Sequence, residues 1–198
     1  MFSAKGKKVW TEIAEDIGAH VESKGRWGST VLRYQSGEWE ITLDTYVVTT
    51  GQTTMVFTRM RAPYVNKDGL KFKIYREGFF GKIGKFFGSQ DLEIGDPDFD
   101  KKFIIKGNNV DTIRELLEAP GLKKMLDNEP HIHLEVKDDE GWFGTKFPDG
   151  VDELYFQCGG ILHDADRIKN LFAIFCVTLD RLVQIESAEE GGPDVKLK

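Results

Sequence analysis

Alternation of apolar and polar residues dominates the first part of this chain, from Thr30 to Tyr75. Trp39, Ile41 and Leu43 alternate with acidic or hydroxyl side chains, which is typical of a β-strand with one buried and one water-exposed face. Gly51-Gln52 is predicted to form a hairpin turn between two such runs. Consecutive strands joined by short turns predict an antiparallel meander.

Two amphipathic segments flank the strands. The first is predicted to form a helix from a cap at Ser3 to about Val21, because its apolar residues recur at helical spacing. The second starts after Asp164 and runs to about Glu186. The wide apolar stripe of this second helix includes Phe172, Phe175 and Leu179.

Runs of strands, in place of strict strand–helix alternation, favour an α+β fold. We expect an antiparallel meander sheet with the N-terminal and the long C-terminal helix packed on one face. No linker-like composition interrupts the interior, so residues 1–186 are expected to form one α+β domain. The tail, residues 187–198, has no apolar pattern and is expected to be disordered.

Acidic residues outnumber basic ones, 33 against 27, and the formal net charge is −6. Nucleic acid is not expected as a partner, since binding to phosphates requires a surplus of positive charge. Cys158 and Cys176 lie in apolar surroundings and are expected to be reduced and buried.

The longest apolar stretch, Leu171–Leu179, is much shorter than the roughly 20 residues that cross a bilayer. No secretory signal is recognisable. The expected location is therefore the cytoplasm, with a peripheral position at the inner membrane as a second expectation.

The most unusual segment is Gly78–Gly88, which contains four Phe, four Gly and two Lys. It does not match a phosphate-binding loop or a dinucleotide fingerprint. Phe offers apolar area and Lys attracts anionic headgroups, so the segment is a candidate for docking to a protein partner or a membrane surface. The alternative is a connection whose Phe residues fold back onto the core. The candidate partner-binding residues are Phe79, Phe80, Lys82, Lys85, Phe86 and Phe87.

His131, His133 and Glu135 occupy alternate positions of a predicted strand, 131–136, so their side chains share one face. His-x-His-x-Glu offers ligands that suit zinc or iron. The opposite face is apolar and would bury the strand, and the three polar residues would then form its wet face. We therefore expect neither a metal nor any other cofactor.

Acidic residues also recur from Asp91 to Asp100, but the positions of an EF-hand loop are not matched and a solvated turn is expected. Within this region, Asp-Pro-Asp-Phe at 96–99 is followed by Lys101-Lys102-Phe103 and the helical run Val110–Glu118. This motif, around Gly95–Glu118, resembles a family of uncharacterised bacterial proteins, a domain of unknown function often found next to membrane spans. The order of elements extends the resemblance from about Leu70 to Ile185.

Three functional hypotheses follow. The first is an uncharacterised non-catalytic binding or scaffolding domain that docks a protein partner or membrane surface through residues 78–88. The alternative is a metal-dependent enzyme that uses His131, His133 and Glu135. A third is a small-molecule carrier with a cavity between the sheet and the C-terminal helix, lined by Phe172, Phe175 and Leu179. An enzyme is the less favoured reading because no nucleophile motif occurs, and the oligomeric state is left open.

Overall fold

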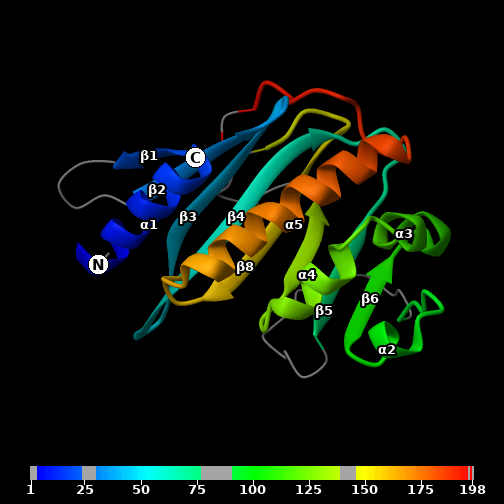
Figure 1. The fold of residues 1–198 in the computed structure, drawn as a ribbon, viewed down its shortest axis with the longest axis horizontal. Helices are drawn as coiled ribbons and strands as arrows, with labels where there is room; N and C mark the ends of the chain where they lie inside the picture. The colour runs from blue at the N-terminus through cyan, green and yellow to red at the C-terminus, as the bar shows by residue number, and fades with distance from the viewer. Residues whose placement is uncertain (1–3, 24–29, 77–90, 139–145, 196, 198) are drawn as a thin grey trace.

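The computed structural model describes residues 4–23, 30–76, 91–138, 146–195 and 197. Its described strands are β1 His20–Ser23, β2 Thr30–Ser36, β3 Trp39–Thr50, β4 Thr53–Val65, β5 Phe72–Arg76, β6 Phe103–Gly107, β7 His133–Lys137 and β8 Val151–Gly159. They form one sheet in the order β1-β2-β3-β4-β8-β7-β5-β6 (Figure 1). All neighbouring strands are antiparallel.

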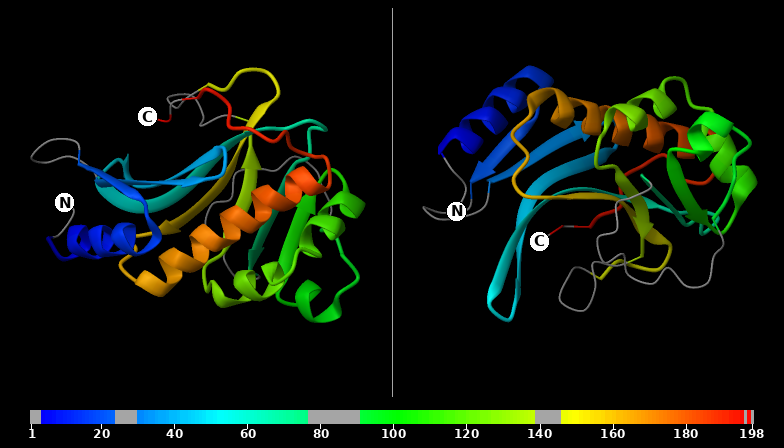
Figure 2. Two further views of the ribbon diagram at one scale, coloured as in Figure 1. Left: turned by 45° about the horizontal axis from the view of Figure 1, so that its top comes forward. Right: turned by 90° about the horizontal axis from the view of Figure 1, so that it is seen from below.

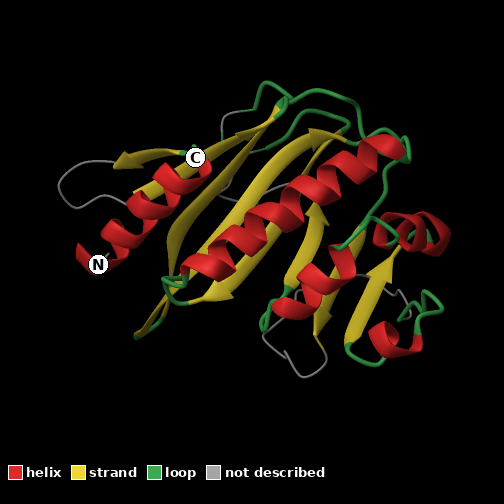
Figure 3. Cartoon of the chain, in the orientation of Figure 1, coloured by secondary structure: helices red, strands yellow, loops and turns green. Residues whose placement is uncertain are grey.

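Helices lie along one face of this sheet (Figure 2 and Figure 3). The described helices are α1 Ala4–Ile17, α2 Pro97–Asp100, α3 Val110–Leu117, α4 Leu122–Asn128 and α5 Ala165–Gln184. The long helix α5 packs against α1, α3 and α4, and α1 also packs on β1 and β2. The predicted α+β class, with an N-terminal and a long C-terminal helix against an antiparallel sheet, is confirmed.

Side-chain caps set the starts of α5 and α3. Asp164 accepts a hydrogen bond from the backbone N–H of Arg167 (3.0 Å) at the start of α5. Asn109 accepts one from Thr112 N–H (3.2 Å) at the start of α3. Helix α1 is shorter than predicted, because Gly18 adopts a positive φ of 71° and turns the chain into β1.

The meander holds only for the first four strands. The last strand, β8, pairs with β4 over the register from Phe57↔Gly159 to Val65↔Val151, and thereby separates β4 from β7. Strand β5 lies between β6 and β7. Local periodicity identifies strands but carries no information on long-range neighbours, so the sequence pattern does not reveal this order.

The hydrophobic core lies between the sheet and the helices. Alternate residues of each strand point into it, including Leu43, Met60, Phe156 and Ile74, all at most 1% exposed. From α5, Phe175 is fully buried in the same cluster. The sheet therefore presents its apolar side to the helices.

The segment after α5 differs from the predicted disordered tail. Ser187 and Ala188 are buried, and Ala188 forms a β-bridge with Asn66. Glu189 N–H donates to the Val65 carbonyl (3.1 Å). Backbone pairing with the end of β4 therefore holds this stretch, which a search for apolar periodicity does not detect.

Candidate functional site

The candidate docking segment, residues 78–88, lies outside the described residues, but both of its attachment points are described. On the entry side, Arg76 ends β5 and donates to Asp127 Oδ1 (3.0 Å) and to the Glu129 carbonyl (3.1 Å). Its guanidinium lies 4.9 Å from the centroid of the Phe103 ring. The chain thus enters the segment from a residue that hydrogen bonds, an ion pair and a ring contact hold in place.

The exit side is fixed to strand β6. Leu92 N–H donates to the Ile105 carbonyl (2.8 Å), and Asp91 forms an ion pair with Lys106 (2.9 Å). The pKa of Lys106 is raised chiefly by its hydrogen bond to Asp91. Because β5 and β6 are neighbours, the candidate segment belongs, together with α2, to the connection between two adjacent strands at the sheet edge.

A cleft of about 310 Å³ lies beside this attachment and is lined by α2, α4 and the start of β6. Its floor is a stacked pair of rings, Phe99 and Phe103, whose centroids are 4.3 Å apart. Its rim carries three lysines and three aspartates, Lys102, Lys123, Lys124, Asp96, Asp98 and Asp127. The cleft therefore combines an aromatic floor with a charged rim.

Ion pairs organise the rim. Lys102 Nζ lies 2.7 Å from Asp127, and Lys123 Nζ lies 2.8 Å from Asp96. The hydrogen bonds of Lys102 and Arg76 hold the pKa of Asp127 below its ordinary value. Lys123 lowers the pKa of Asp96 in the same way. Both carboxylates are thus stabilised in the ionised form.

The acidic turn that precedes the cleft has a structural role. Asp96 accepts from Phe99 N–H (3.2 Å) and caps α2. The carboxylate of Asp100 accepts backbone hydrogen bonds from Ile94 (3.0 Å), Gly95 (3.1 Å) and Asp96 (3.1 Å). The motif that resembles the uncharacterised bacterial family therefore builds a tight turn, which positions Phe99 against Phe103.

The sheet face opposite the helices carries a second charged region, which sequence reasoning did not single out. Residues in register form a row across five strands: Thr42, Arg61, Tyr155, Glu135 and Lys73. All five are at most 6% exposed. The sequence shows that these residues alternate with core residues, but such alternation predicts that the polar side chains face water.

Ion pairs connect this region. Lys73 Nζ lies 2.7 Å from Glu135, and Lys137 Nζ lies 3.3 Å from the same carboxylate. At the next position along the sheet, Asp44 binds Arg59 (2.7 Å) and Arg61 (2.7 Å). We name these six residues, with His133, the buried charge array.

The environment of the array keeps the Glu135 carboxylate ionised. Burial alone would raise the pKa of Glu135, but contact with His133 and the charges of Lys137 and Lys73 outweigh it and lower this pKa to about 2. Burial raises the pKa of Tyr155. At neutral pH, Glu135 is an ionised partner of lysines and is a poor proton donor or acceptor.

The predicted wet face of His131, His133 and Glu135 is not observed. His131 precedes β7 and is exposed, whereas His133 is 4% exposed and Glu135 is 6% exposed. His133 Nε2 lies 3.5 Å from Glu135, which already pairs with lysine. Within the described ranges, no group of three or more His, Cys, Asp or Glu side chains is placed to hold a metal ion.

Other sequence candidates are placed in the core. Phe172, Phe175 and Leu179 belong to the hydrophobic cluster and are at most 4% exposed, as expected for packing residues. Cys158 is a free, buried thiol whose pKa burial raises to about 11. It is therefore protonated at neutral pH and is not an activated nucleophile. Cys176 is also free and is half-buried.

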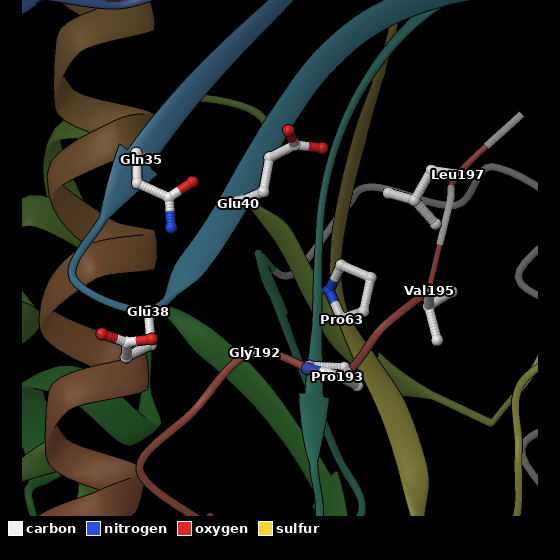
Figure 4. Close-up of a pocket in the computed structure, with 8 residues that line it drawn as sticks. All are labelled: Gln35, Glu38, Glu40, Pro63, Gly192, Pro193, Val195 and Leu197. Carbon is white, nitrogen blue, oxygen red and sulfur yellow. The ribbon is translucent and has the colours of Figure 1, made fainter.

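A small pocket of about 110 Å³ lies where the C-terminal segment crosses the helix-free face (Figure 2 and Figure 4). Pro63 has no N–H to donate, and the ladder between β3 and β4 ends two residues earlier, at Thr42↔Arg61. The pocket is lined on one side by the tail residues Pro193, Val195 and Leu197. Figure 4 shows Glu40 on the other side of the pocket. The tail thus packs where the two strands separate.

Comparisons with known proteins identify the fold. No family model and no curated protein sequence matches this chain. A similar solved structure is that of the mycobacterial trehalose monomycolate transport factor A, TtfA, with a TM-score of 0.54 and 10% sequence identity. The match covers 98% of this chain and 100% of the TtfA chain. The TM-score shows that this chain shares its fold with a bacterial protein, and at this identity the similarity concerns the fold alone.

The structure also bears on membrane association. Among the described helices, none combines the length and the apolar character needed to cross a membrane.

Proposed function

We propose that this chain is a non-catalytic binding domain that docks on an anionic membrane surface through residues 78–88 and assists the transport of an amphiphilic lipid. The observation that carries the proposal is the attachment of this segment. Its entry at Arg76 and its exit at Asp91 are fixed by ion pairs beside a cleft with an aromatic floor and a lysine-containing rim. A rigid base of this kind fixes both ends of the segment beside the cleft, and the sequence of the segment contains four Phe and two Lys.

The lysines of the segment itself, Lys82 and Lys85, support an anionic target. On the cleft rim, three lysines are balanced by three aspartates, so the rim does not repel an anionic surface. Each Lys or Arg near an anionic surface contributes on the order of 1 kcal/mol, and each buried Phe about 1.5–3 kcal/mol. The two contributions reinforce each other, although the net charge of −6 opposes binding by the chain as a whole.

Two further points support the lipid-transport part of the proposal. TtfA, which shares the fold over almost the whole chain, is a trehalose monomycolate transport factor. The family that the sequence around Gly95–Glu118 resembles often carries membrane spans next to the soluble domain. The inert state of Glu135 and Cys158 supports a non-catalytic role. We place the chain in the cytoplasm, at the inner membrane face.

Vesicle sedimentation tests the docking step. The double variant Phe80→Ser/Phe86→Ser is expected to keep its thermal stability and to lose binding to vesicles of phosphatidylglycerol. A control, Gln184→Ser, places serine at an exposed position of α5, away from the segment, and is expected to bind as the wild type does. If the Phe variant unfolds, the segment is part of the core and the proposal is wrong. If wild-type protein ignores vesicles but chemical cross-linking captures a protein through residues 78–88, the target is a protein partner.

A further inference from the structure

The hairpin that joins β3 and β4 has a composition unlike the rest of the chain. Charged residues make up 30% of the sequence, yet the fourteen residues Thr45–Thr58 contain none. We call this stretch the arm. It contains six threonines at 45, 49, 50, 53, 54 and 58, and an apolar group formed by Tyr46, Val47, Val48, Met55, Val56 and Phe57.

Matched side chains stabilise the arm internally. The register places Thr45 opposite Thr58, Tyr46 opposite Phe57, Val47 opposite Val56, and Thr49 opposite Thr54. The Tyr46 and Phe57 rings stack with centroids 5.3 Å apart. Cross-strand pairs of this kind stabilise a two-stranded ribbon. Gly51, with a φ of 58°, allows the tight turn at its tip.

The arm extends beyond the strands that flank it. The register between β2 and β3 ends at Leu32↔Leu43, and that between β4 and β8 ends at Phe57↔Gly159. Figure 1 and Figure 2 show the β3–β4 hairpin projecting past the end of β8. Among the described residues, Val47 (60% exposed) and Met55 (44%) are the large hydrophobic side chains left in water.

The edge of the arm has none of the devices that prevent strands from pairing. Natural edge strands are protected by lysines, prolines or β-bulges. The arm contains no Lys or Pro, and its register runs without a bulge from Thr42↔Arg61 to Thr50↔Thr53. Among the described residues, no strand pairs with this edge of β3 beyond Leu43, so the edge can accept a further strand.

The position of the apolar group argues against insertion into a bilayer. The tip, residues 49–54, consists of Thr, Gly and Gln and would have to enter the lipid before any apolar residue. Open strand edges are also costly in hydrocarbon, where their N–H and C=O groups have no partner. The apolar residues lie on the shaft and are suited to contact from the side.

We propose that the β3 edge of the arm pairs, antiparallel, with the same edge of a second copy of this chain. An antiparallel edge is compatible with two-fold symmetry, because both copies offer the same backbone groups. Because the arm carries no charged residue, two arms can meet without like-charge repulsion. The net charge of −6 lies in the remainder of the chain. Pairing also covers Val47 of both copies.

Sedimentation velocity over a wide concentration range tests this interface on the full chain. Wild-type protein is expected to form dimers. Val47→Lys places two like charges at adjacent strands and is expected to weaken dimerisation at least about tenfold. Gln184→Lys adds the same charge at an exposed position of α5 and is expected to leave dimerisation unchanged. Phe80→Ser/Phe86→Ser is also expected to remain dimeric, so this proposal and vesicle docking are tested separately.

Cysteine cross-linking gives a second readout that does not depend on the behaviour of a charged variant. Val47→Cys is expected to form a disulfide-linked dimer under mild oxidation, and Gln184→Cys is expected to remain monomeric on a non-reducing gel. A wild-type protein that stays monomeric at all concentrations would overturn the proposal. So would a dimer that Val47→Lys leaves intact, or a Val47→Cys variant that does not cross-link.

Discussion

The two faces of the sheet are built by the same strands but are stabilised by different interactions. Under the helices, alternate residues such as Leu43, Met60 and Phe156 form an apolar core. On the other face, their neighbours are polar and include the buried charges of Asp44 and Arg61, and none of the described helices covers them. The first face depends on close packing, whereas the second depends on each charge keeping its partner. The comparison shows that polar alternation in a strand does not by itself mean exposure to water.

The largest effect is expected on the apolar face. Phe175→Ala removes a fully buried ring beneath α5 and is expected to lower the free energy of unfolding by about 3–5 kcal/mol. Urea unfolding followed by circular dichroism measures it. A loss below about 1 kcal/mol would mean that α5 does not pack on the sheet as described.

On the charged face, Asp44→Asn should be almost as destabilising. Arg61 is 1% exposed, and its guanidinium depends on the Asp44 carboxylate 2.7 Å away. Leaving it without this charge is expected to cost about 3 kcal/mol, the low end for a broken buried pair, because Arg59 remains partly accessible to water. If the same urea experiment finds Asp44→Asn as stable as the wild type, the array does not contribute to the free energy of unfolding, and the two faces differ only in composition.

The array should also make stability depend on acid. Since the pKa of Glu135 falls from 4.5 to about 2 in the folded state, its stabilisation is complete above pH 4.5 and is lost as the pH falls through 2. The contribution at neutral pH is about 3 kcal/mol, at about 1.4 kcal/mol per pKa unit. Glu135→Gln is expected to be less stable than the wild type at pH 7 and to converge with it near pH 2. Parallel pH profiles would contradict this assignment.

The smallest effect is expected for an exposed pair of the same geometry. Lys169 Nζ lies 2.8 Å from Asp16, as close as the pairs of the array, but these side chains are 40% and 62% exposed. Water screens such a pair, so Lys169→Gln should leave the urea midpoint unchanged. A shift as large as that of Asp44→Asn would show that burial is not what distinguishes the array.

Much of the fold is predictable because it depends on local patterns. The caps Asp164 and Asn109, the turn at Gly51 and the burial of Phe175 all follow from short-range spacing. The insertion of β8 beside β4 and the bridge at Ala188 are long-range pairings, which local spacing does not encode.

The candidate site, like the fold, has features that local sequence predicts and features that depend on long-range pairing. The composition of residues 78–88 predicts a docking segment, and this stays a prediction because they lie outside the described residues. Strand alternation predicts a wet face for His133 and Glu135, but the neighbouring strands supply Lys73 and bury both residues. Only the pairing of distant strands brings the array together. A count of charged residues along the chain would have indicated the uncharged arm at Thr45–Thr58.

Hydrogen–deuterium exchange with and without phosphatidylglycerol vesicles tests the central claim, docking through residues 78–88, most directly. The account predicts that vesicles slow exchange in peptides covering 78–88 and leave peptides of the arm, Thr45–Thr58, unchanged. The account would be contradicted if vesicles slowed exchange in the arm and left exchange in residues 78–88 unchanged.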